Sequence, residues 1–194
     1  MFGSTFRVLA LPVVAVGALA LLGVTAGQAS AETIASGTGT FTVPLSVETT
    51  LARAGVVVVA SGDASSSYDN TTKTFTTVYN ATGGNADVTN FDGTVDYSGG
   101  VKVVNVYNGK TATLGALQFD VLDDQIDLTA NGTANPYLDL GGTQSAAING
   151  TSQSISASEL SLDAAGASYL NTALGTCAFT AGTDFGSFTT TYSG

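Results

Sequence analysis

Apolar and polar residues alternate along most of the chain, and glycine or asparagine residues separate the alternating stretches. The alternation is clearest over 41–47 and 117–121, where every second residue is apolar. A period of two residues is typical of antiparallel strands with one buried face. Further strands are predicted over 56–60, 74–80, 91–97, 101–107, 126–128, 154–160 and 185–192. We therefore expect a mainly β protein, either an antiparallel β-sandwich or a flattened barrel.

Two segments depart from this period and predict one or two short helices. In the second, Asp163 can cap a helix over 164–174, and Gly175 can adopt the left-handed conformation that ends helices. In the first, Ser46 is the candidate cap of a helix that starts at 47 and ends before Gly55. One core is expected from the apolar residues on the inner faces: Phe41, Val43, Val57, Phe91, Val95, Val103, Leu117, Phe119, Leu160, Leu170 and Phe188.

Three local patterns give more detailed expectations. The apolar run Val56–Ala60 is typical of a central strand. The glycine-rich stretch 81–85 predicts a turn between strands, and the pair Asn108-Gly109 favours a type I′ hairpin turn after a strand that ends at Tyr107.

The N-terminus has the pattern of a secretory signal peptide. Arg7 precedes an unbroken apolar run over 8–24, and small residues then lead to an Ala-x-Ala pattern at 29–31. A membrane anchor is the alternative, but the run is short for a bilayer span and a cleavage pattern follows it. We expect a signal peptide at 1–31 and a single secreted domain at 32–194, extracellular or associated with the cell envelope, with no transmembrane segment after cleavage.

Charge narrows the range of partners. The chain has 5 basic and 15 acidic side chains and a net charge of −10, and without Arg7 four basic side chains face fifteen acidic ones, a net charge of −11. Such a surface repels polyanions, so nucleic acid is not an expected partner. Cys177 is the single cysteine. We expect it to be a small buried apolar residue; an intermolecular disulfide or a reactive thiol is the alternative.

Three stretches, 51–58, 91–100 and 160–186, together resemble the Htaa domain family, secreted or surface β-rich modules of actinobacteria associated with haem acquisition. The resemblance spans most of the chain after residue 31. It implies a β-rich fold and raises haem binding, which in that family uses a tyrosine with a histidine nearby. This chain has no histidine or tryptophan. It also has Ser98-Gly99-Gly100 where the family commonly has Gly-His, and no residue here matches the ligating tyrosine.

Residue chemistry leaves few candidates for a bound group. For haem, the oxygen ligands to consider are Tyr97, Tyr107 and Tyr169, whose alternative role is packing in or beside the core. The acidic cluster Asp120, Asp123, Asp124 and Asp127 offers oxygen ligands to calcium, but its spacing is not that of an EF-hand, and a solvated hairpin tip is the alternative. No cofactor is otherwise expected.

The absence of histidine removes the commonest general base and zinc ligand. We therefore expect no enzymatic activity. The first hypothesis is a secreted, non-enzymatic binding or envelope-associated module with an unidentified ligand, or an unidentified protein or cell-envelope partner. One alternative is a haem-binding or haem-relay domain of the Htaa type. Another is a structural surface protein that self-associates through an exposed sheet edge.

Overall fold

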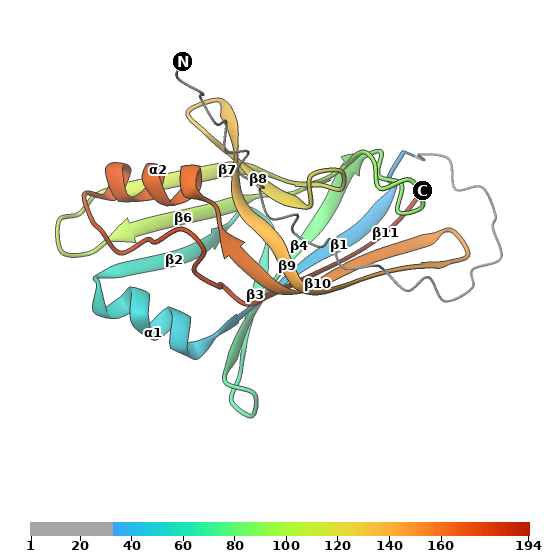
Figure 1. Ribbon diagram of the computed structural model, residues 1–194. Helices are drawn as coiled ribbons and strands as arrows, with labels where there is room; N and C mark the ends of the chain where they lie inside the picture. Colours follow the sequence, from blue (N-terminus) through green and yellow to red (C-terminus); the bar gives the residue numbers. More distant parts are fainter. Residues whose placement is uncertain (1–32) are drawn as a thin grey trace, which may run out of the picture.

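The computed structural model describes residues 33–194, so the predicted signal peptide at 1–31 lies outside the described residues. Within them the chain forms eleven strands and two helices (Figure 1). In chain order these are β1 (Ser36–Pro44), α1 (Leu45–Arg53), β2 (Val56–Ser61), β3 (Ser65–Asp69), β4 (Thr74–Gly84), β5 (Thr94–Tyr97), β6 (Gly100–Asn105), β7 (Thr111–Asp120), β8 (Gln125–Ala130), β9 (Thr133–Asn149), β10 (Ser152–Leu162), α2 (Ala164–Leu174) and β11 (Ser187–Ser193).

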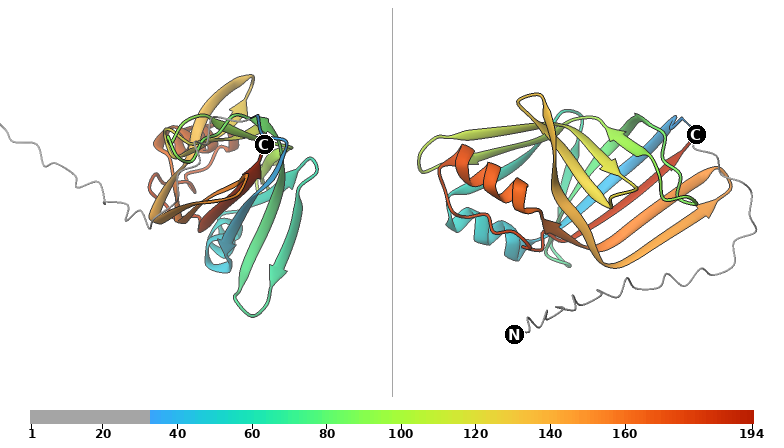
Figure 2. Two further views of the ribbon diagram at one scale, coloured as in Figure 1. Left: turned by 90° about the vertical axis from the view of Figure 1, so that its right-hand side faces the viewer. Right: turned by 45° about the horizontal axis from the view of Figure 1, so that its top comes forward.

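Eight of the strands form a closed antiparallel ring. Its order is β7-β5-β4-β1-β11-β10-β9-β8, and the pairing of β7 with β8 closes it. The other three strands extend the ring: β6 pairs with β7 and β2 with β6, while β3 pairs with β4. Figure 2 shows the β3–β4 hairpin projecting from the barrel. The expected class, a mainly β antiparallel barrel or sandwich with two short helices, is confirmed.

Aromatic side chains fill the barrel where opposite strands approach. Phe188 on β11 and Phe119 on β7 are fully buried. The ring centroid of Phe188 lies 5.4 Å from that of Phe119 and 4.8 Å from that of Phe41. Aromatic pairs at these separations add to the free energy gained from apolar burial. The core therefore joins strands from both ends of the sequence.

Helix α2 forms as its sequence predicts. The Asp163 side chain accepts hydrogen bonds from the backbone N–H groups of Ala165 and Gly166, and Gly175 ends the helix at φ 59°. The helix packs on β9, where Gly166 allows close approach, because a Cβ there would lie 3.0 Å from Cδ1 of Tyr137.

The first helix and its neighbours differ from expectation. Helix α1 begins at Leu45, directly after Pro44 of β1, and Ser46 makes no capping hydrogen bond. Pro44 has φ −64°, the value that its ring imposes, and an extended ψ of 144°, the conformation of a residue that precedes a helix. Proline also has no backbone N–H that would need a partner there, so the helix begins directly after it. The apolar run Val56–Ala60, expected to be a central strand, lies in β2, which pairs only with β6 and is therefore an edge strand.

Two predicted turns are also wrong. Residues 81–84 continue β4, because they pair with β5. The hairpin after β6 is longer than a type I′ turn: β6 ends at Asn105, whose N–H donates to the carbonyl of Lys110, and only Gly109 has a positive φ in the loop. The Asn108 carboxamide instead donates to the carbonyl of Leu174 at the end of α2.

Three residues expected inside are on the surface. Val57 is 41% exposed because it faces outward from the edge strand β2, and Phe91 is 38% exposed in the loop before β5. Cys177, expected to be buried, is exposed in the segment after α2, where no regular element covers it. The residues that the structure describes include no helix with both the length and the apolarity needed to cross a bilayer.

Candidate functional site

The shortness of β5 divides the barrel wall. Strand β5 has four residues, whereas its neighbours β4 and β7 have 11 and 10. It pairs with residues 81–84 of β4 and 118–120 of β7. The other halves of these long strands take separate partners, β3 on residues 74–78 of β4 and β6 on residues 111–114 of β7. Where β5 ends, the wall therefore has a gap between the unpaired edges of β3 and β2. We call this gap the side opening.

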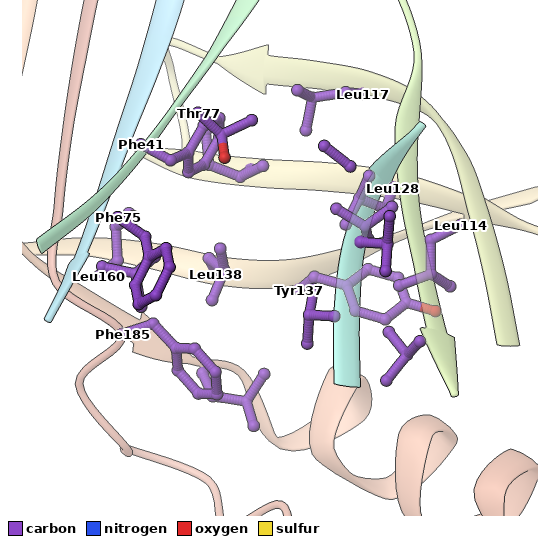
Figure 3. Close-up of a pocket in the computed structure, with 18 of the residues that line it drawn as sticks. Phe41, Phe75, Thr77, Leu114, Leu117, Leu128, Tyr137, Leu138, Leu160 and Phe185 are labelled. Carbon is purple, nitrogen blue, oxygen red and sulfur yellow. The ribbon is translucent and has the colours of Figure 1, made fainter. Parts of the chain in front are cut away.

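A cavity of about 370 Å³ lies behind the side opening. Ser66 on β3 and Val59 on β2, both exposed, belong to its wall, which places the mouth between these two strands. Figure 3 shows Phe75, Phe185, Leu138 and other apolar side chains around the cavity. Most of the wall is apolar: Phe41, Val43, Val58, Val59, Ala60, Phe75, Val101, Val103, Leu114, Leu117, Ile126, Leu128, Leu138, Leu160, Leu162, Leu170, Phe179 and Phe185.

Three of the polar side chains in the wall are paired within the protein. The Ser66 and Thr77 hydroxyls lie 3.1 Å apart and share a hydrogen bond. The Tyr79 hydroxyl donates to the carbonyl of Gly100 at 3.0 Å. This hydrogen bond links β4 to β6 at the end of the side opening next to β5. Burial raises the pKa of Tyr79 to about 12, so this phenol keeps its proton at neutral pH.

The Tyr137 hydroxyl is one of five buried side-chain oxygens in residues 33–194 that have no hydrogen-bond partner; the others belong to Ser98, Asp127, Asp139 and Tyr192. Tyr137 lies on β9 with 2% of its surface exposed, and its hydroxyl is a buried polar atom without a hydrogen-bond partner. Among residues 33–194 it is the only such atom that belongs to a residue of the cavity wall. Burial, and to a lesser degree Tyr169, raises the pKa of Tyr137 to about 12. Its hydroxyl end points toward Leu114 (Figure 3).

Glu48 is the only charged side chain in the cavity wall as the structure describes it. It lies on α1 and is half-buried, so its carboxylate is near both the cavity and the solvent. Burial raises the pKa of Glu48 above its usual value, because apolar surroundings disfavour the charged form. The arrangement is an apolar chamber with one acidic group on α1 and one unpaired phenol on β9.

The three tyrosines singled out from the sequence lie apart from this cavity and from one another. Tyr97 is buried on β5, and its hydroxyl donates to Oγ1 of Thr190 at 2.6 Å. Burial raises the pKa of Tyr97. Tyr107 is 74% exposed in the loop between β6 and β7, and its hydroxyl donates to the carbonyl of Arg53. Tyr169 is half-buried on α2, edge-on to Tyr137 with 6.0 Å between ring centroids.

The acidic cluster lies around the β7–β8 hairpin. Asp120 accepts hydrogen bonds from the backbone N–H groups of Leu122 and Asp123, as is usual at a turn. Burial raises the pKa of Asp124 and of Asp127, and the negative charge of Asp120 adds to both shifts. Within residues 33–194, no three histidine, cysteine or acidic side chains are grouped closely enough to hold a metal ion.

The backbone after β5 requires glycine at two successive positions, Gly99 and Gly100. Gly99 has φ 94°, and a Cβ there would overlap the carbonyl of Ser61; a Cβ at Gly100 would overlap the carbonyl of Leu114. Neither position can hold a side chain in this conformation. The same close contacts hold the turn between β5 and β6 against Ser61 on β2 and Leu114 on β7, at the end of the side opening next to β5.

Neither Glu48 nor Tyr137 is among the candidate site residues that the sequence predicts, and no strand is predicted around Tyr137. The one available signal for Tyr137 was its position in Pro136-Tyr137-Leu138-Asp139-Leu140, where aromatic and apolar residues alternate with polar ones.

No family model matches the sequence, and no curated protein matches it. The fold is similar to that of a solved structure, the C-terminal domain of HtaA from Corynebacterium glutamicum, with a TM-score of 0.54 and 17% sequence identity. The similarity covers 83% of this chain and 98% of the other. An HtaA-like fold, which the sequence resemblance implied, is therefore supported, and at this identity the likeness concerns the fold alone.

Proposed function

We propose that this domain is a non-enzymatic binding module that holds a small, largely apolar molecule in the cavity behind the side opening. The observation that carries the proposal is a cavity of about 370 Å³ whose wall is mostly aliphatic and aromatic. Ligand pockets for small molecules are typically about 300–1,000 Å³, mainly apolar, with a few polar groups that orient the ligand. Both properties are present here.

The polar groups of the wall support binding rather than catalysis. General acid–base chemistry and covalent catalysis need a nucleophile or a proton-transfer group beside a second group that activates it. The cavity wall has one carboxylate, Glu48, and its serine and threonine hydroxyls bond to each other. The pattern of the N-terminus supports a role outside the cytoplasm, as a secreted or envelope-associated protein.

Haem binding is the alternative function. Its support is the family resemblance together with the likeness in fold. If haem enters the cavity, Tyr137 is the phenol that remains unpaired there, because the Tyr97 and Tyr107 hydroxyls already donate to protein oxygens and Tyr169 is not part of the wall. An uncharged, largely apolar ligand is favoured over haem, because haem carries two carboxylates, the wall includes the carboxylate of Glu48, and the chain as a whole is acidic.

Self-association, the other alternative from the sequence, has candidate edges in β2 and β3. Each pairs with one strand only. These are also the strands that frame the side opening, so association there would cover the mouth of the cavity.

Titration of the purified protein with N-phenyl-1-naphthylamine tests the proposed function. This uncharged fluorophore brightens in apolar surroundings, and we expect saturable binding of one molecule per chain. Leu138→Trp adds volume in the middle of the cavity, so it should weaken binding at least about tenfold, which corresponds to about 1.4 kcal/mol.

The matched control is Leu122→Trp. Leu122 is 67% exposed and lies outside the cavity wall, so this variant should bind as the unaltered protein does. Absence of saturable binding, or equal binding by both variants, would count against a cavity ligand. A stoichiometric Soret shift with haemin that Tyr137→Phe abolishes would support the haem alternative instead.

A further inference from the structure

Strand β2 is an open sheet edge without the features that usually protect one. Among the strands of residues 33–194, only β2 and β3 have a single partner strand. Native edges are commonly blocked by charged side chains, proline or a β-bulge. Strand β3 is polar and ends at Asp69, whereas β2 has no charged residue and no proline, and its register with β6 is continuous. Of the two, β2 is the edge suited to pair with another strand.

The hydrogen-bond pattern shows which backbone groups of β2 are open to a partner. The carbonyl of Gly55, directly before β2, accepts a hydrogen bond from the N–H of Val106, directly after β6. Residues that bond to a given neighbour alternate along an antiparallel strand, so the odd-numbered residues of β2 bond to β6. The even-numbered residues direct their N–H and C=O groups to the free edge: Val56, Val58 and Ala60.

A second copy of the same strand matches this edge in one antiparallel register. With a two-fold axis at Val58, this residue lies opposite its own copy and Val56 lies opposite Ala60 of the other chain. All the edge-directed residues then exchange pairs of backbone hydrogen bonds. The same register places Val57 opposite Val59 of the other chain on the outer face. Their side chains are 41% and 51% exposed in the single chain, so pairing also buries apolar surface.

Charge favours contact at this edge over the rest of an acidic surface. The chain has 15 acidic side chains, and none lies within 49–62 or 97–119, the stretches that contain β2 and β6. Two copies with a net charge of −10 repel each other, and contact through strands without carboxylates keeps that repulsion low. The antiparallel arrangement also brings the loop after β2, with Asp63, beside the end of α1 of the other chain, with Arg53, so opposite charges meet at both ends of the contact.

We propose that two copies of this chain associate through β2. The result is a symmetric dimer whose sheet continues from β6 and β2 of one copy into β2 and β6 of the other. The partner strand lies in the side opening, because β2 and β3 run apart from the short loop at 62–64 that joins them (Figure 1).

Sedimentation velocity of the purified protein over a range of concentrations tests the association, and we expect a monomer–dimer equilibrium. Val57→Lys places a charge on the exposed face of the edge strand, as native edge strands do, and should weaken the dimer at least about tenfold. The matched control is Thr113→Lys. Thr113 is exposed on the same face of β7, which β6 separates from β2, so this variant should associate as the unaltered protein does.

Cysteine cross-linking tests the register. All chains first carry Cys177→Ser, because Cys177 is exposed and could cross-link by itself. A mixture of Val57→Cys chains and Val59→Cys chains of different tag length, oxidised with glutathione disulfide, should give a linked dimer with one chain of each kind, because directly opposed residues lie within disulfide range. Either variant alone should cross-link far less, because its two cysteines are then diagonal neighbours, with Cα atoms about 7–8 Å apart.

Three results would overturn the proposal. The first is a protein that stays monomeric up to its solubility limit. The second is a dimer that Val57→Lys leaves intact, which would place the contact on another surface. The third is equal cross-linking of the mixture and of the single variants, which would contradict the register. None of these measurements involves a cavity ligand, so their outcome is independent of the proposed binding function.

Discussion

Gly39 on β1 lies directly against the ring of Tyr97 in the barrel interior. A Cβ at this position would be 2.7 Å from Cε1 of Tyr97, closer than van der Waals contact permits. The ring cannot easily move aside, because its hydroxyl is held by Thr190 at 2.6 Å. Tyr97, considered from the sequence as a haem ligand, is thus part of a tightly packed contact between β1, β5 and β11.

Gly39→Ala should therefore destabilise the protein by about 1–3 kcal/mol, the usual cost of adding volume to a filled core. Urea denaturation followed by circular dichroism measures the change. Gly115→Ala on β7 is the control, because nothing lies within 4 Å of a Cβ there and its φ is ordinary. Equal stability of the two variants would show that the contact with Tyr97 is looser than described.

At the scale of single elements, the two helices differ in how they begin. Helix α2 has a side-chain cap in Asp163, whereas α1 starts after Pro44 and has none. The sequence supported a cap for both, since serine and aspartate are both favoured at this position. The difference comes from Pro44, which occupies the capping position of α1, so that Ser46 already lies within the helix.

Asp163→Ala should lower stability by about 1 kcal/mol, because two N–H groups at the start of α2 lose their acceptor. Ser46→Ala should change stability by less than about 0.5 kcal/mol, as a surface substitution without a capping role does. Thermal unfolding of the two variants side by side provides the measurement. A larger loss in Ser46→Ala than in Asp163→Ala would contradict the cap assignment.

Which elements could be predicted depended on whether one face of a strand is buried. The hairpin of β7 and β8 was predicted because Leu117, Phe119 and Ile126 point into the core at every second position. Strand β3 was missed because all five of its residues are exposed and none marks an inner face. Strand β9 was missed because its second half is largely exposed and the pair Gly141-Gly142 resembles a turn.

The cavity could not be predicted for a different reason. Its wall combines residues from both helices and most of the strands, and their meeting depends on pairings between distant segments that a single sequence does not reveal. The four successive valines of β2 predict a strand that is buried on both faces. The strand forms, but only one face is covered: Val58 faces the cavity, and Val57 faces the solvent.

At the scale of the whole molecule, buried acids affect how stability depends on pH. Burial raises the pKa of Glu48, Asp124, Asp127 and Asp139. An acid whose pKa is higher in the folded chain binds its proton more tightly there, so protonation stabilises the fold. That stabilisation is complete below the unfolded pKa, near 4, and is lost as pH rises through the folded value.

The protein should therefore unfold at a higher temperature at pH 5 than at pH 7.5 at constant ionic strength. Asp69, whose pKa is lowered by hydrogen bonds from Thr71 and Thr72, opposes this trend only in more acidic solution. Asp127→Asn should reduce the difference between the two pH values, and Asp63→Asn, at an exposed position between β2 and β3, serves as the charge-matched control. A lower melting temperature at pH 5 than at pH 7.5 would contradict this account.

The position of β11 has a consequence for the order in which the chain folds. This strand, the last along the sequence, lies between β1 and β10 and pairs with both. Until residues 187–193 are available, β1 and β10 each have one edge without a partner, and such edges recruit other strands. Ring closure is thus a late event that joins segments more than 140 residues apart, as in Phe41 and Phe188. Contacts of such long range slow folding, so a nascent or truncated chain exposes these unpaired edges to aggregation for longer.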